Sequence, residues 1–259
     1  MPTAVPLVRT PITTPTPSGG TSPGGSPGGT SPGGAPGGTR GTSGPDSLSG
    51  TAGANLIFGL GGPDSIFGLG ENDSLYGGDA DDSLLGEAGN DLLFGGAGRD
   101  SVLGAVGDDT FYGGKGSDSM LGDEGNDLLF GNQDTDTLLG GAGNDTFFGG
   151  GGDDSLVGGI GDDCLSGDRG RDTLTGGDGN DTFAIGREAE GDLIIDFTDG
   201  TDRIRLTAGL TFGELTISAG AGTSPSTIIQ LTSTKETLAT LFGVTRASIS
   251  QADFIIGNG

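Results

Sequence analysis

Residues 122–130 read Gly122-Asp-Glu-Gly-Asn-Asp-Leu-Leu-Phe130, and most of the chain repeats this nine-residue pattern. Its leading glycine recurs at residue 41 and at every ninth residue up to residue 176, which makes sixteen consecutive nonapeptides over residues 41–184. The sixth position is Asp in fifteen of them, with Asn55 as the exception, and the eighth is always apolar, from Leu48 to Phe183. A short fixed period of this kind predicts stacked identical units, a solenoid.

Each unit divides into a turn and a strand. The first six residues of the pattern tolerate positive φ and predict a turn, whereas the last three predict a minimal strand with an apolar centre. One apolar residue in nine cannot form a core alone, so the units must stack to bury it. The fourth position is Gly except at Glu71, Ala80 and Asp134, each of which is expected to cost about 1 kcal/mol if the turn requires positive φ there.

Stacking places the sixth-position carboxylates above one another, about 4.8 Å apart. Residues 41–184 contain 27 acidic and 4 basic residues, so this array repels itself unless cations neutralise it. Carboxylates together with turn carbonyls suit a hard cation such as Ca²⁺, which we expect in multiple copies between successive turns. The candidate metal ligands are Asp46, Asp64, Asp73, Asp82, Asp91, Asp100, Asp109, Asp118, Asp127, Asp136, Asp145, Asp154, Asp163, Asp172 and Asp181.

A period of 18 underlies the period of 9, which indicates two nonapeptides per coil. The ninth position of alternate units carries a run of aromatic residues, whereas the intervening units carry mostly aliphatic ones. Side chains that flank the strand centre point away from the core, so the aromatic residues predict an outward stripe. The rings either pack on one another or contact a cell-surface or self-association partner. The stripe comprises Phe58, Tyr76, Phe94, Tyr112, Phe130 and Phe148.

The pattern G-G-x-G-x-D-x-(apolar)-x resembles the RTX, or hemolysin-type, calcium-binding nonapeptide repeat. The resemblance implies a right-handed parallel β-roll, with each calcium held between neighbouring turns by sixth-position Asp carboxylates and turn carbonyls. The segment 191–206 is similar to the one that closes such rolls. Residues 251–259 resemble an uncleaved C-terminal signal for type I secretion, which agrees with the lack of an N-terminal signal-peptide pattern.

The regions on either side of the repeats differ from them in composition. Residues 1–40 form a Pro/Gly/Ser/Thr-rich tract that predicts a disordered linker. Residues 185–259 contain alternating β-branched residues and predict a small β cap, so the whole chain is assigned to the all-β class. The predicted cap strands are 193–197, 203–206, 214–217, 227–231 and 237–242, with a last strand or helical turn at 252–256.

Composition excludes several functions. The net charge of −25 disfavours nucleic acid and anionic membrane as partners, and no apolar run approaches the ~20 residues of a transmembrane segment. With no His and one Cys, a Ser-His-Asp triad and a His- or Cys-rich zinc site cannot form. Cys164 stands at an outward seventh position, where it replaces Ser or Thr. Adjacent Asp pairs such as Asp81–Asp82 are products of the repeat rather than a catalytic dyad.

We therefore expect a secreted, extracellular calcium-binding β-roll, not an enzyme, that folds on calcium outside the cell and has a structural or adhesive surface role. The alternative is a calcium-binding secretion and folding module of an RTX enzyme or toxin whose catalytic domain is absent from this chain, since only forty low-complexity residues precede the repeats. An ice-binding solenoid is disfavoured, because one outward row is aromatic rather than Thr or Asn.

Overall fold

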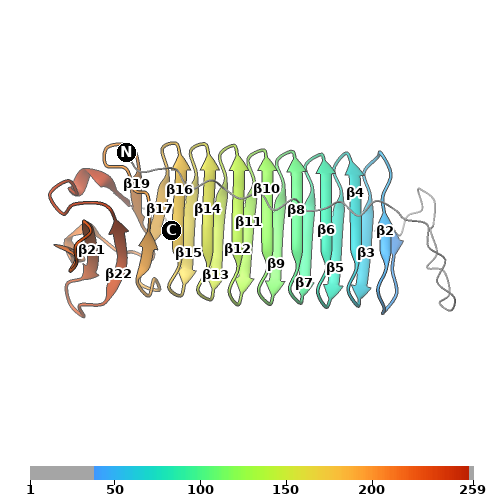
Figure 1. Ribbon diagram of the computed structural model, residues 1–259, viewed down its shortest axis with the longest axis horizontal. Coiled ribbons are helices and arrows are strands. Elements are labelled where there is room, and N and C mark those ends of the chain that lie inside the picture. Colours follow the sequence, from blue (N-terminus) through green and yellow to red (C-terminus); the bar gives the residue numbers. More distant parts are fainter. Residues whose placement is uncertain (1–37, 257–259) are drawn as a thin grey trace.

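The computed structural model describes residues 38–256 and shows a parallel β-solenoid of two sheets that run the length of the molecule (Figure 1). The predicted tract at residues 1–37 and the last three residues, 257–259, lie outside the described residues. In the part of the chain that the structure describes, no helix is long and apolar enough to cross a membrane, and the helical elements are two short 3-10 turns, η1 (Phe212–Glu214) and η2 (Gln251–Asp253).

All odd-numbered strands except β21 form one sheet, here called sheet A. The even-numbered strands and β21 form the other, sheet B. In spatial order, sheet A contains β1 (Thr39–Arg40), β3 (Leu56–Gly61), β5 (Ser74–Asp79), β7 (Leu92–Ala97), β9 (Thr110–Lys115), β11 (Leu128–Gln133), β13 (Thr146–Gly151), β15 (Cys164–Arg169), β17 (Thr182–Ile185), β19 (Arg203–Leu206) and β23 (Phe254–Ile256). Sheet B contains β2 (Ser47–Ser49), β4 (Ser65–Gly70), β6 (Ser83–Ala88), β8 (Ser101–Val106), β10 (Ser119–Glu124), β12 (Thr137–Ala142), β14 (Ser155–Ile160), β16 (Thr173–Asp178), β18 (Asp192–Ile194), β22 (Thr237–Phe242), β21 (Ser226–Leu231) and β20 (Leu215–Ala219).

Neighbouring strands within the repeat region are parallel and offset by 18 residues. In sheet B, Met120 pairs with Leu138, and in sheet A, Leu129 pairs with Phe147. This register confirms the prediction of two nonapeptides per coil. β1 pairs with β3 in the same register, so sheet A begins two residues inside the tract predicted to be disordered.

The core is a single stack of eighth-position side chains between the two sheets. All sixteen are buried, from Leu48 at 7% exposed to Phe183 at 0%, as the pattern predicts. The strands are longer than the three residues predicted, because most include the first three positions of the following unit as well. Each turn is correspondingly shorter, and it bends at the fourth and fifth positions.

From the unit that begins at Gly59 onward, positive φ occurs at two positions of the unit. The fourth position has it even where glycine is replaced, with φ of 61° at Glu71, 81° at Ala80 and 71° at Asp134, so the condition for the expected cost is met at all three. The second position also has positive φ, a feature that the glycine pattern did not reveal because many side chains occur there. The non-glycine examples are Leu60, Leu69, Glu87, Ala105, Asp123, Asn132 and Asp168.

The C-terminal segment continues both sheets and then covers their end (Figure 1). β18 extends sheet B and β19 extends sheet A, both in parallel. β22 then pairs in parallel with β18, and β23 with β19. β20, β21 and β22 then form an antiparallel meander at the edge of sheet B. The predicted strands are found with shifts at their ends, the largest being that the first one ends at Ile194 rather than at Phe197.

Candidate metal centre

The sixth-position side chains form two columns, one in each row of turns. Column one contains Asp46 and every eighteenth residue after it to Asp172, and column two contains Asn55 and every eighteenth residue after it to Asp181. Within a column, one carboxylate oxygen accepts a hydrogen bond from the backbone N–H of the residue 18 positions earlier. Asp118 N–H donates to Asp136 Oδ1 at 2.8 Å in column one, and Asp109 N–H donates to Asp127 Oδ1 at 2.8 Å in column two. All fifteen predicted ligands lie in these columns.

The second carboxylate oxygen has no such partner. In fourteen aspartates, Oδ2 is buried and accepts no hydrogen bond, although buried polar atoms are normally paired. An unpaired buried carboxylate oxygen carries a desolvation cost that a cation would remove. The fourteen are Asp64, Asp73, Asp82, Asp91, Asp100, Asp109, Asp118, Asp127, Asp136, Asp145, Asp154, Asp163, Asp172 and Asp192.

A main-chain carbonyl lies beside these oxygens. Asp64 Oδ2 and the carbonyl oxygen of Gly77 lie 2.3 and 2.4 Å from the point that a Cβ on Gly59 would occupy. The same arrangement recurs along both columns, so the first position must be glycine to leave this space open. A carboxylate oxygen and a carbonyl oxygen facing one small space are the donor types that Ca²⁺ takes. The residues present therefore fit a hard cation.

No three acidic or Cys side chains within residues 38–256 converge to hold a metal ion. The carboxylates are stacked one per coil, so an ion in a column would need main-chain carbonyls as its remaining protein ligands, a donor type that Ca²⁺ commonly takes. The contribution of turn carbonyls and the identity of each ligand set stay predictions.

Burial of the columns changes their acid–base behaviour. Desolvation is the largest cause, and neighbouring carboxylates add to it, so that the pKa of Asp109, Asp127 and Asp136 rises to about 7. The backbone N–H that each group accepts opposes the rise but does not cancel it. The columns are therefore buried negative charge that binding of either protons or cations would relieve.

The first turns are closed differently from those in the interior. Asp46 Oδ2 accepts hydrogen bonds from Thr42 N–H at 2.6 Å and from Thr42 Oγ1 at 2.9 Å. Asn55 Oδ1 accepts from the backbone and the hydroxyl of Thr51, both at 3.1 Å. A threonine at the second position thus satisfies the oxygen that has no partner in the interior turns.

Two further aspartates, Asp192 and Asp202, join the columns although sequence reasoning missed them. Asp172 N–H donates to Asp192 Oδ1 at 3.2 Å, and Asp181 N–H donates to Asp202 Oδ1 at 3.0 Å. Their spacing from the preceding members is 20 and 21 residues, so the nonapeptide period does not include them. The available signal was local, because both stand two residues before a buried isoleucine, as the sixth position stands before the eighth.

The aromatic stripe lies on the outer face of sheet A as a continuous stack. Consecutive rings have centroids 4.7–5.1 Å apart and interplanar angles of 5–18°, and the guanidinium of Arg40 lies over Phe58. Most of the rings are half-buried, and Phe148 at the end of the stack is 36% exposed. The rings therefore pack on one another, and no partner follows from these contacts.

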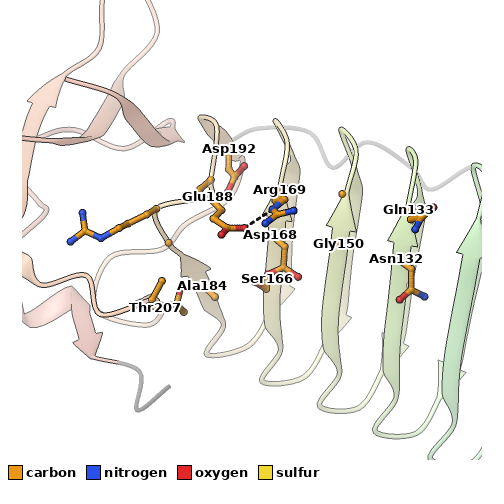
Figure 2. Close-up of a pocket in the computed structure, with 15 residues that line it drawn as sticks. Asn132, Gln133, Gly150, Ser166, Asp168, Arg169, Ala184, Glu188, Asp192 and Thr207 are labelled. Carbon is orange, nitrogen blue, oxygen red and sulfur yellow. Dashed lines mark hydrogen bonds and ion pairs between the residues drawn. The ribbon is translucent and has the colours of Figure 1, made fainter. Parts of the chain in front are cut away.

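The stripe stops where Ser166 and Ala184 take the ninth position, and a hollow of about 520 Å³ lies there (Figure 2). Arg169 and Glu188 form an exposed ion pair within it, and Ser166 Oγ donates to Asp168 Oδ1 at 2.7 Å. Cys164, which the sequence predicts to replace Ser or Thr at an outward seventh position, lies on the same strand as Ser166. It is half-buried, and Arg205 Nη1 lies 3.1 Å from its sulfur. Within the hollow, Arg169 and Glu188 are paired across the junction of the repeats and the C-terminal segment, whereas the lining residues Asp168 and Asp192 form no ion pair among the described residues.

The family model for the RTX calcium-binding nonapeptide repeat matches residues 40–187 in seven overlapping stretches, more than half of the chain. This chain belongs to the RTX family. Together with the two columns, membership supports a calcium-binding β-roll.

Two solved structures resemble this RTX chain. The solution structure of the AlgE6R3 subunit from the Azotobacter vinelandii mannuronan C5-epimerase is 33% identical, with a TM-score of 0.40, and the match covers 48% of this chain and 80% of that one. The crystal structure of extracellular lipase LipA from Serratia marcescens is 19% identical, with a TM-score of 0.38, and the match covers 78% of this chain but 41% of the lipase. A search of the curated proteins finds no sequence match.

Proposed function

We propose that this protein is a secreted calcium-dependent β-roll with a structural or adhesive role at the cell surface, and that it is not an enzyme. The observation that carries the proposal is the set of fourteen buried aspartate oxygens without partners. While its carboxylates are charged, a fold that buries so many unpaired carboxylate oxygens needs metal cations to be stable.

Calcium would be held by the sixth-position aspartates together with turn carbonyls, and Asp46 at the edge would contribute least, because Thr42 already donates to its Oδ2. The bound ion would supply positive charge between the coils. The oxygens that bind it lie in a column only after the coils have stacked. Binding and folding are therefore one process, as in other domains whose metal ligands come together only in the folded state.

This coupling accounts for the proposed location. Extracellular calcium modules are tuned to about 10⁻⁴–10⁻³ M, well above the concentrations at which cytosolic sensors respond. The chain would remain unfolded in the cytoplasm, where it can be exported, and would fold outside. RTX proteins are typically secreted, and we place the export signal at residues 251–259, of which 257–259 lie outside the described residues.

Far-UV circular dichroism tests the proposal. In excess chelator at neutral pH the chain should show little β signal, and millimolar Ca²⁺ should restore it cooperatively. Mg²⁺ should act poorly, because it demands octahedral geometry and dehydrates reluctantly. A strong β spectrum in excess chelator at pH 8 would contradict the proposal.

A matched pair of variants locates the effect. Asp127→Asn removes an interior carboxylate and should raise the calcium midpoint and lower cooperativity. Asp46→Asn should have little effect, because Thr42 already donates to Asp46 and Asn55 occupies the equivalent place in the other column. Equal effects of the two variants would argue against shared sites between stacked turns.

A further inference from the structure

The two aspartate columns end differently in the C-terminal segment. Asp192 is the last member of column one and Asp202 the last member of column two. Both are almost fully buried, at 1% and 3% exposed. The difference is in the second carboxylate oxygen.

Asp202 Oδ2 accepts a hydrogen bond from Thr198 N–H at 2.7 Å, so it is satisfied within its own turn. This repeats the arrangement at the other end of the molecule, where Thr42 and Thr51 donate to Asp46 and Asn55. Column two is thus closed at both ends by a threonine four residues before the sixth-position residue.

Asp192 Oδ2 is buried and has no partner, like the interior members of the columns. Within residues 38–256, no basic side chain forms an ion pair with it. Two arginines line the same hollow as Asp192, and both pair with other groups. Arg169 pairs with Glu188 (Figure 2), and Arg187 pairs with Glu214. Asp172, the neighbour of Asp192 in column one, also has an unpaired buried Oδ2.

We infer that Asp192, supplied by the C-terminal segment, completes an additional calcium site with Asp172, and that Asp202 ends column two without an ion. The inference rests on the proposed function, in which the columns bind calcium. It adds a ligand from outside the nonapeptides and distinguishes it from Asp202, which occupies the equivalent place in the other column.

The location of the site gives it a structural role. Asp192 is the first residue of β18, which pairs with β16 through only two residues and with β22 on its other side. β22 in turn carries the antiparallel strands β21 and β20. An ion between the Asp172 and Asp192 turns therefore joins the C-terminal meander to the roll, and the meander should become ordered only when calcium is bound.

Native mass spectrometry of the full chain at saturating Ca²⁺ counts the ions directly. Asp192→Asn should bind one ion fewer than the wild type, whereas Asp202→Asn should bind the wild-type number. Asparagine keeps the Oδ1 acceptor for the Asp172 N–H, so folding at high calcium should be retained. An unchanged ion count in Asp192→Asn, or the same loss in Asp202→Asn, would overturn the inference.

Two further measurements separate the causes of failure. Asp127→Asn should also lose bound calcium, and if it loses none then the proposed function itself fails rather than this inference alone. Hydrogen exchange on the wild type needs no variant: protection of β22 should rise at the same calcium concentration as that of β11. Full protection of β22 in chelator would refute the calcium-dependent joining of the meander.

Discussion

Lowering the pH should fold the metal-free chain, which is the opposite of ordinary acid denaturation. Eleven aspartates of the two columns have a pKa raised from 3.8 to about 6 or 7, chiefly by burial, and in all of them except Asp145 neighbouring carboxylates add to the rise. They are Asp82, Asp91, Asp100, Asp109, Asp118, Asp127, Asp136, Asp145, Asp154, Asp163 and Asp181.

The magnitude is large enough to decide whether the chain folds. A rise of this size corresponds to about 3–4 kcal/mol per group, at 1.36 kcal/mol per pH unit. The roll is only two sheets thick, so nearby water screens each charge, and we retain about 1 kcal/mol per carboxylate. Eleven such groups destabilise the charged, metal-free roll by about 10 kcal/mol, which is comparable with the whole free energy of unfolding of a typical domain.

The sign follows from the direction of the pKa changes. Because the folded-state pKa lies above the unfolded value, protonation stabilises the fold fully below about pH 4, and this stabilisation is lost as the pH rises through 6–7. The metal-free roll should therefore be more stable at pH 5 than at pH 8. In saturating calcium the trend should reverse, because protons then compete with the ion for the same carboxylates.

Circular dichroism of calcium-free protein between pH 8 and pH 5 measures this transition, at low concentration and above the sequence pI of about 4.1 to limit aggregation. The β signal should appear as the pH falls below about 7. The double variant Asp109→Asn/Asp127→Asn, with two fewer titrating groups, should fold at a higher pH. A chain that remains unfolded throughout, or that is more structured at pH 8, would refute the reasoning.

Three other predictions concern stability and export. Ala80→Gly should stabilise the calcium-loaded roll by about 1 kcal/mol, because glycine adopts the positive φ at this position without strain. Gly89→Ala should destabilise it by more than that, because the new Cβ would lie 2.3 Å from the Glu71 carbonyl oxygen. Chemical denaturation measures the free energy of unfolding of both variants. Tyr112→Ala removes two ring contacts and should cost about twice as much free energy of unfolding as Phe148→Ala, which removes one. Deleting residues 251–259 should retain the protein in the cytoplasm, and its appearance in the culture medium would show that the export signal lies elsewhere.

Most of the roll could be predicted because its chemistry is periodic. The buried eighth position, the 18-residue register and the fifteen aspartates of the columns all follow from one repeating unit. The length of the strands could not be read in the same way, because the second and third positions vary in sequence while keeping a common backbone. At Leu60 and Leu69 the stacked neighbours impose a positive φ that those residues would not adopt alone.

The ends of the columns were missed for a different reason. Asp192 and Asp202 are brought into line by turns two and three residues longer than a repeat would give, so only the folded backbone reveals their position. The local path of each turn decides whether the second carboxylate oxygen finds a partner. It leaves Asp192 Oδ2 unpaired but brings a threonine N–H to Asp46 and to Asp202. A pattern of residue types does not contain that information.

The 18-residue register also limits how the gene for such a protein can change in length. Deleting or duplicating 18 codons would remove or add one whole coil, so each later strand would stay in its own sheet and each later aspartate in its own column. A change of nine codons would move every later unit to the opposite sheet, where Phe130 would follow the aliphatic row that contains Leu121. Growth by recombination should therefore proceed in even numbers of nonapeptides, and the sixteen units present here satisfy that parity.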